Sequence, residues 1–385
     1  MLVIKNAKIY TSAGVVYEKG DILIENGKIV DVGENLNCEQ GEIIDCSGLT
    51  VIPGIVDAHS HIGGFGTDMS DQDLNEMTKN TTPEVEAIYS INAKSLMFQR
   101  AIKAGITTSC IAPGSGNVIG GLACAVKSHG KSIYDMCIKN PVALKAALGG
   151  NPKGVYGKRN QLPMTRMGIA SVLRDTLIKG KEYIIKREKG EADFDAGLEN
   201  VAKVLRKEIP LKVHCEQFDM LTTIRIAEEF DIEFTLDHAW GASDFYDDIV
   251  DSKNLKGVIY GPIGVLLLPG ECGKIDIYSL IELDKRGVTC AIMTDGPICN
   301  PELIIVQAGE VVRFGGDIER VINMLTINPA RIIGVDDRVG SIEKGKDADL
   351  VIFEGMPALD TNAKVRYTII NGEIVYVDSN GDHKN

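Results

Sequence analysis

The middle of the chain alternates short apolar segments with longer runs of helical character. Eight apolar segments have the length of strands, at residues 55–61, 106–112, 122–127, 142–148, 211–215, 233–237, 257–260 and 289–294. Helix-like runs lie between them, at residues 84–104, 165–185, 195–207, 221–230, 275–285 and 317–326. This order over about 280 residues predicts an α/β fold, and a (β/α)8 TIM-like barrel fits the count of strands. A doubly wound open sheet is the structural alternative, but the sequence contains no G-x-G-x-x-G fingerprint to support it.

The two ends of the chain are different from the middle, because both consist of short strands joined by turns. Asn26-Gly27 and Asn371-Gly372 are hairpin signals, and each lies between two segments of alternating polarity. Two similar ends that flank a different middle predict one small β-sandwich domain made from both termini. We therefore expect a composite β domain of residues 1–52 plus 338–385 and a barrel of residues 53–337.

Histidines recur at the carboxyl ends of the predicted strands. His59 and His61 stand two residues apart, so on a strand they project from the same face. His214 ends the segment 211–215, and His238 directly follows the segment 233–237. Asp295 follows the last segment. In a barrel these strand ends form the face on which active sites are built, so the five side chains are expected to converge.

Such a set of side chains suits a divalent metal ion. Imidazoles and a carboxylate are common ligands of catalytic zinc, although Fe, Mn or Co can occupy a similar set. Four histidines and an aspartate at strand ends are hard to explain by packing alone, because buried polar groups are costly unless they are paired. Asp237 alternates to the opposite face from His238 and is expected to be structural.

Charge and composition narrow the classes of partner. A net charge of −13 and a pI near 5.1 argue against a nucleic-acid or anionic-membrane surface. The first residues lack the pattern of a signal peptide, no window has the apolar length of a membrane span, and the nine cysteines form no C-x-x-C pair. We expect a cytoplasmic protein with reduced thiols that acts on a small molecule, possibly as a homo-oligomer.

The combined motifs resemble the amidohydrolase superfamily of metal-dependent hydrolases, in particular its imidazolonepropionase-related branch. PGIVDAHSH at residues 53–61 resembles the first-strand metal motif. APGSGNVIGG at residues 112–121 resembles the loop after the second strand, and residues 326–334 with 340–350 resemble the closing segment. The resemblance implies that His59, His61, His214 and Asp295 are metal ligands. It implies that His238 binds a second metal or hydrogen-bonds the attacking water, and that Asp295 is the general base.

Gly150 and Gln217 depart from the pattern of the resembled family. Gly150 stands where relatives often carry a metal-binding Glu, which favours one metal ion over two. Related deaminases place a Glu three residues after the equivalent of His214, whereas here that position is Gln217 and the carboxylate is Glu216. Glu216 shares the face of His214 on an ideal strand, so it could contact the substrate; a surface carboxylate is the alternative. Some superfamily members bridge two metals with a carboxylated lysine; Lys145 lies on the corresponding strand but is expected to be a surface or core-edge residue.

The resemblance implies hydrolysis of a C–N bond in an amide or cyclic amide, for example in a dipeptide-like or N-acyl compound. A deaminase or ring-opening hydrolase of a heterocycle is the alternative within the same class, and a non-catalytic barrel that acts as a scaffold is the alternative outside it. Basic residues after the fourth strand, among them Arg159 and Arg166, could clamp a substrate carboxylate, although a solvated loop is the other interpretation.

Overall fold

The computed structural model describes residues 1–37, 41–66, 71–263 and 271–378. Its central feature is an eight-stranded sheet in which every strand pairs with the next one along the chain. The strands are β6 (Ile55–Ser60), β7 (Ile106–Ile111), β8 (Ile119–Lys127), β9 (Cys137–Ala147), β10 (Leu211–Cys215), β11 (Phe234–His238), β12 (Leu255–Tyr260) and β13 (Cys290–Ile292). Backbone hydrogen bonds close the sheet beyond β13: Asp295 N donates to His59 O (3.1 Å) and His61 N to Gly296 O (2.7 Å). The predicted barrel class is confirmed.

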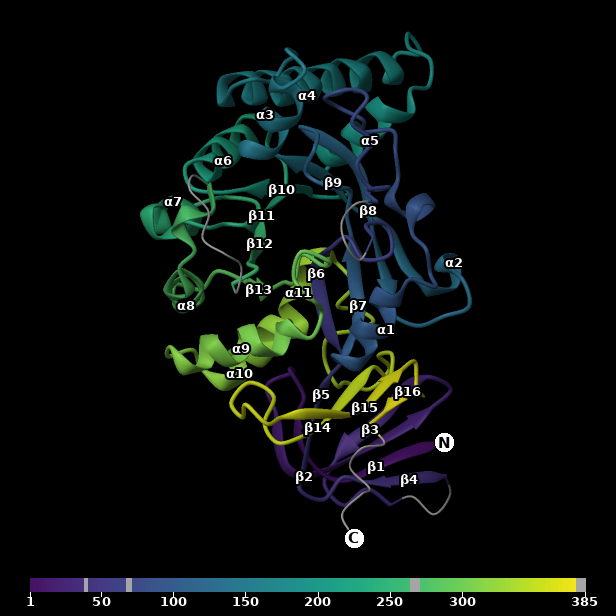
Figure 1. The fold of residues 1–385 in the computed structure, drawn as a ribbon. Coiled ribbons are helices and arrows are strands. Elements are labelled where there is room, and N and C mark those ends of the chain that lie inside the picture. The colour runs from purple at the N-terminus through teal and green to yellow at the C-terminus, as the bar shows by residue number, and fades with distance from the viewer. Residues whose placement is uncertain (38–40, 67–70, 264–270, 379–385) are drawn as a thin grey trace.

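Helices cover the outside of this sheet (Figure 1). They are α1 (Leu96–Lys103), α2 (Ile133–Met136), α3 (Gly150–Gly157), α4 (Arg166–Glu188), α5 (Ala196–Leu205), α6 (Asp219–Phe230), α7 (Tyr246–Val250), α8 (Ile277–Lys285), α9 (Leu303–Arg313), α10 (Ile318–Leu325) and α11 (Ile327–Ile333), with short 3₁₀ turns η1 (Ala87–Ser90), η2 (Ala242–Asp244) and η3 (Glu271–Lys274). Polar residues fix several starts: Thr165, Asp195 and Asp317 accept from backbone N–H groups of α4, α5 and α10.

Strand β8 departs from the regular alternation of parallel strands and helices. It pairs antiparallel with both β7 and β9, whereas the other neighbouring strands are parallel. Only residues 112–118 separate β7 from β8. A parallel crossover needs a dozen or more residues, so this short connection forces the chain to turn back.

Strands from both termini form a second eight-stranded sheet, at the bottom of Figure 1. Its order is β16-β15-β14-β5-β1-β2-β3, and β4 pairs with β1. The strands are β1 (Leu2–Tyr10), β2 (Val16–Glu25), β3 (Lys28–Gly33), β4 (Glu42–Asp45), β5 (Leu49–Pro53), β14 (Leu350–Glu354), β15 (Lys364–Ile370) and β16 (Glu373–Val377). The expected sheet from both termini is thus confirmed, and it has its own apolar core of residues such as Ile4, Ile22 and Ile352.

The chain passes from this sheet to the barrel at Gly54. Its N–H donates to the carbonyl of Asp349 (2.8 Å), and a Cβ at this position would lie 2.1 Å from Thr107 Oγ1. This close approach requires glycine. The junction thereby sets where β6 starts, and β6 carries the first metal motif. Among the helices of the described residues, none combines the length and apolar character that a bilayer crossing requires.

Candidate active site

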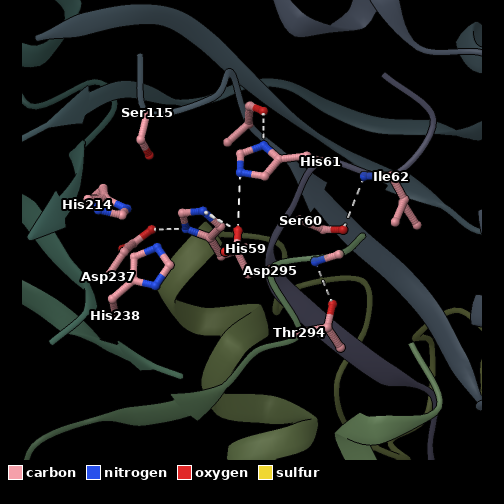
Figure 2. Close-up of polar contacts among 12 residues, drawn as sticks. His59, Ser60, His61, Ile62, Ser115, His214, Asp237, His238, Thr294 and Asp295 are labelled. Carbon is pink, nitrogen blue, oxygen red and sulfur yellow. Dashed lines mark hydrogen bonds and ion pairs between the residues drawn. The ribbon is translucent and has the colours of Figure 1, made fainter. Parts of the chain in front are cut away.

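The end of β6 places His59 and His61 in the interior of the barrel mouth. Both side chains are buried, and their ring centroids are 5.2 Å apart. His61 also stacks on the ring of Phe65 at 4.7 Å. Figure 2 shows the two imidazoles facing the same space as His214, His238 and Asp295. The structure therefore brings together all five predicted site residues, each from a different strand end except the first pair.

A fixed acceptor holds one nitrogen of each of these two rings. His59 Nδ1 lies 2.5 Å from Asp237 Oδ2, and His61 Nδ1 lies 2.8 Å from the carbonyl oxygen of Ala112. A carboxylate and a carbonyl accept hydrogen bonds, so each Nδ1 carries the proton. In the neutral rings Nε2 then bears a lone pair, which is the arrangement found in metal-binding histidines.

Asp295 lies opposite these two lone pairs. Its Oδ1 is 3.2 Å from His61 Nε2 and 3.5 Å from His59 Nε2. Burial alone would raise the pKa of Asp295, but its contacts with His61, His238 and His59 lower it overall, so the carboxylate is ionised. Asp295 has a φ of 54° and His238 one of 69°. Left-handed backbone is uncommon for residues other than glycine and often marks functional sites.

A divalent cation fits this cluster. Two lone pairs that face an ionised oxygen repel it unless a positive charge lies between them. His59 Nε2 is also buried without a hydrogen-bond partner among the described residues. One ligand atom from each of His59, His61 and Asp295 lies within 4.8 Å of the others. The donor set, two imidazoles and a carboxylate, is typical of divalent metal sites.

His214 and His238 extend the cluster along the next two strands. Their ring centroids are 4.1 Å apart, and His238 is 5.1 Å from His59. His238 Nδ1 is 2.9 Å from the carbonyl of Gly261, which again leaves Nε2 as the free nitrogen. His214 Nε2 lies 3.3 Å from Glu216 Oε1, and His214 Nδ1 is buried without a partner within the described part of the chain.

Burial keeps these imidazoles neutral. Desolvation lowers the pKa of His214 and of His238 to about 3, and it lowers that of His59 well below its usual value. Positive charges nearby act in the same direction, Lys145 on His214 and Lys212 on His59. Neutral imidazole is the form that binds metal, so the site is ready for a cation at neutral pH.

Lys145 was expected to be a surface or core-edge residue, and the structure shows that this expectation is wrong. It points into the barrel from β9, is fully buried, and donates to Ser115 Oγ at 2.8 Å. Desolvation, together with the charge of Lys212, lowers the pKa of Lys145 to about 8, although carboxylates nearby oppose that change. Lys145 is therefore part of the interior that supports the site.

Asp237 was expected to have only a structural role, but it contacts His59 of the histidine cluster directly. Asp237 Oδ2 receives hydrogen bonds from His59 Nδ1 and lies 2.7 Å from Lys212 Nζ, while Thr235 Oγ1 donates to Oδ1 at 2.6 Å. Asp57 was missed as well; it accepts from Thr294 Oγ1 at 2.5 Å and so ties β6 to the segment before Asp295. Both aspartates could have been recognised in the sequence, because each is a charged residue in an otherwise apolar strand. A charged side chain is rarely buried without a partner.

A pocket of about 340 Å³ opens over the cluster. His61, His214 and Asp295 form its floor, and its walls include Phe65, Asn75, Ser115 and Asn151. Arg159 and Arg166 are not among the described residues that line it. Arg159 donates to the carbonyl of Met77 and lies over the ring of Tyr156, and Arg166 pairs with Asp219 at 2.8 Å. Glu216 is buried beside His214 at the edge of the site.

Comparison with known proteins agrees with this geometry. The amidohydrolase family model matches residues 262–375. The solved structure of an amidohydrolase from Thermotoga maritima MSB8 is 37% identical, with 98% of this chain and 100% of that chain covered and a TM-score of 0.94. An imidazolonepropionase from Thermoplasma acidophilum is 26% identical over 96% of this chain and 91% of its own length.

A further relative is amidohydrolase tasK of Hapsidospora irregularis, which is 26% identical over 88% of this chain. The chain spans 38% of that protein's length. The Thermotoga structure matches over the whole chain at a level of identity that establishes common descent. Together with the histidine and aspartate cluster at the strand ends, this match shows that the chain belongs to the amidohydrolase superfamily of metal-dependent hydrolases.

Proposed function

We propose that this protein hydrolyses the C–N bond of an amide or cyclic amide in a small molecule, with one zinc ion as cofactor. The observation that carries the proposal is the cluster of His59, His61 and Asp295, whose lone pairs and carboxylate face one another at the floor of an open pocket. His59, His61 and Asp295 would hold the ion, and His214 and His238 would complete its surroundings. When bound, the ion supplies Lewis-acid activation of a water molecule and of the scissile carbonyl.

Asp295 is the general base and then the general acid of the reaction. Its carboxylate is ionised and lines the pocket, so it can take a proton from the attacking water. The same oxygen then returns that proton to the leaving nitrogen, which departs as a neutral amine. Its left-handed backbone and the Asp57–Thr294 hydrogen bond hold Asp295 in place for both transfers.

His238 and Glu216 act on the substrate side of the reaction. His238 Nδ1 is held by the carbonyl of Gly261, so Nε2 is free to orient the attacking water or the carbonyl oxygen. Glu216 lies 3.3 Å from His214 and can receive a hydrogen bond from a substrate N–H group. Both roles need a substrate of small size, because the pocket measures about 340 Å³.

A ring-opening hydrolase or deaminase of a heterocycle is the second candidate. The relative named imidazolonepropionase favours it, since that name describes a ring substrate. Release of ammonia separates a deaminase from a ring-opening enzyme. A scaffold without catalysis is the weaker alternative, because all five predicted metal-site residues are present and converge.

The test is hydrolysis by zinc-loaded protein of a panel of linear amides, cyclic amides and amidines. Product amine, ammonia and ring-opened acid are measured separately. The proposal expects turnover with at least one class that disappears on chelation, returns with zinc and is lost in Asp295→Asn. Turnover that survives both chelation and Asp295→Asn would overturn it.

A further inference from the structure

We infer that the pocket selects an uncharged substrate that presents a carboxamide, ureide or lactam edge, and that Asn75 and Asn151 are its specificity-determining residues. The inference rests on the proposed function and names the substrate class of the same site. It excludes substrates whose recognition depends on a free carboxylate, which includes the dipeptide-like compounds considered from the sequence.

The walls of the pocket carry amide groups in place of charges. Gln72, Asn75 and Asn151 contribute three primary amides, and Ser115 contributes a hydroxyl. Among the described lining residues there is no lysine or arginine. The sequence also has none in the ranges 67–70 and 264–270. A substrate carboxylate in such a pocket would lose its hydration without gaining a protein cation, and that loss is costly.

The cations nearest to the walls already have partners. Lys145 lies behind Ser115 and donates to its hydroxyl oxygen at 2.8 Å. Arg159 donates to a backbone carbonyl, and Arg166 pairs with the buried carboxylate of Asp219. The predicted carboxylate clamp therefore has no free cation at the described walls.

Asn75 is held as a rigid part of one wall. Its Nδ2 donates to Gln72 Oε1 at 2.8 Å, and its Oδ1 accepts from Gly116 N at 3.3 Å. A side-chain amide has two donor hydrogens and two acceptor lone pairs, so one of each remains for a ligand. A group that offers both a donor and an acceptor, such as a carboxamide or ureide, is the complement of this edge.

The glycine-rich loop after β7 explains how Asn75 reaches the wall. A Cβ at Gly114 would lie 2.2 Å from Asn75 Oδ1, and a Cβ at Gly116 would lie 2.6 Å from Met77 Sδ. A side chain at Gly114 would displace the amide of Asn75, so glycine there lets Asn75 lie directly on the loop. The Gly-Ser-Gly sequence thus brings an amide to the pocket instead of binding a phosphate.

Asn151 places a second amide beside the reaction centre. It lies in the first turn of α3, and its Nδ2 lies 3.4 Å from His214 Nε2. Apolar side chains of Phe65, Val155 and Ile298 complete the lining. Amides and apolar side chains that line one pocket together suit a small neutral molecule.

The experiment compares compounds that differ only by a carboxylate. Zinc-loaded protein is assayed with 5,6-dihydrouracil against dihydroorotate, and with N-acetylglycinamide against N-acetylglycine. Binding is followed in parallel by the fluorescence of Trp240, the one tryptophan of the chain, whose ring lies 5.1 Å from His238. We expect the neutral member of at least one pair to exceed its partner at least tenfold in kcat/KM and in affinity.

Variants then connect the preference to the two asparagines. Asn75→Asp and Asn151→Asp keep the side-chain shape and should raise KM for the neutral compound about tenfold or more, with bound zinc unchanged. Asn151→Leu removes the amide altogether. Its matched control is Gln161→Leu, which removes an exposed amide outside the pocket and should leave KM and bound zinc unchanged.

The outcomes separate the two claims. Turnover that favours the carboxylated members, or that is unaffected in Asn75→Asp and Asn151→Asp, overturns the inference and leaves the proposed function standing. Binding that prefers the neutral members without any turnover supports the inference and contradicts the proposed function. If neither binding nor turnover occurs across the panel, both claims are wrong.

Discussion

Two buried polar clusters lie at opposite ends of the barrel and differ in how their charges are balanced. At the end near the terminal sheet, Lys127 Nζ lies 2.5 Å from Asp349 and 3.0 Å from Asp347. Asp347 also pairs with Lys28 and Arg338. At the other end, the lone pairs of His59 and His61 face the carboxylate of Asp295.

The difference shows which cluster serves the fold and which one serves the chemistry. Lys127, Asp347 and Asp349 are buried, as are the histidines, so burial does not distinguish the two clusters. In the Lys127 cluster positive and negative groups alternate, and the protein itself supplies the balance. The histidine cluster directs two imidazole lone pairs and a carboxylate toward one point, which is the arrangement that a divalent ion completes.

The largest effect is expected for the double variant His59→Ala/His61→Ala. It removes two electron-pair donors at once, so the protein should lose its tightly bound metal, and hydrolysis should fall to background. Elemental analysis and thermal denaturation with and without zinc check this. Zinc should raise the stability of the native protein by about 4 kcal/mol at 1,000 times the dissociation constant and leave the variant unchanged. Equal stabilisation of both proteins would contradict the assignment.

Lys127→Met should damage the fold and spare the metal. It leaves Asp349 buried without its cation, and breaking a buried pair typically costs about 3–5 kcal/mol. The free energy of unfolding in denaturant measures this loss. Lys8→Met, which removes an exposed pair with Glu18, is the matched control and should cost less than about 1 kcal/mol. Loss of zinc from folded Lys127→Met would contradict the claim that the Lys127 cluster stabilises the fold without contributing to metal binding.

Asp295→Asn should retain metal but reduce turnover by about a hundredfold or more, because the amide cannot accept the proton of the attacking water. Steady-state kinetics on metal-loaded protein measure the effect, and metal analysis of the same sample provides the control. A variant with full turnover would remove Asp295 from the reaction.

Asp237→Asn should weaken metal binding by about 10- to 100-fold, because it removes the carboxylate that fixes the ring of His59. Titration against a competing chelator measures the affinity. Asp231→Asn, at an exposed aspartate, is the control. An unchanged affinity would return Asp237 to a purely structural role.

The metal-free protein should also respond to acid. His214 and His238 have folded pKa values of about 3, below the usual 6.5, so their contribution to stability is complete above pH 6.5 and is lost as the pH falls toward 3. Each contributes a slope of about 1.4 kcal/mol per pH unit in that window. The lowered pKa of Asp347 delays its loss until the pH is below about 4.

Denaturant titrations of the metal-free protein and of His214→Asn/His238→Asn at pH values between 4 and 6.5 measure this contribution. Burial raises the pKa of Asp57 to about 7, so Asp57 opposes the histidines over the same window in both proteins. Stability should fall less steeply with acid in the double variant than in the native protein. The same pH dependence in both proteins would show that the histidines are not held neutral.

The sequence made the convergence of the ligands predictable, because period-two alternation and strand ends are local properties. It could not place Asp237, since its partner His59 is 178 residues away in the chain and on a different strand. Lys145 looked like an edge residue for the same reason, because its burial depends on strands that close the barrel. The reversed direction of β8 follows from the short connection of residues 112–118. Patterns of apolar and polar residues predict strands and helices but not the direction in which a strand runs.

The most direct test of the account is the metal content per chain of protein purified without chelators or added metal. It should be measured by elemental analysis beside His59→Ala/His61→Ala and Lys127→Met. We expect about one equivalent of divalent metal in the native protein and in folded Lys127→Met, and none in the double variant. A native protein that holds no metal and takes up none on reconstitution would contradict the claim that the histidine cluster is a metal centre.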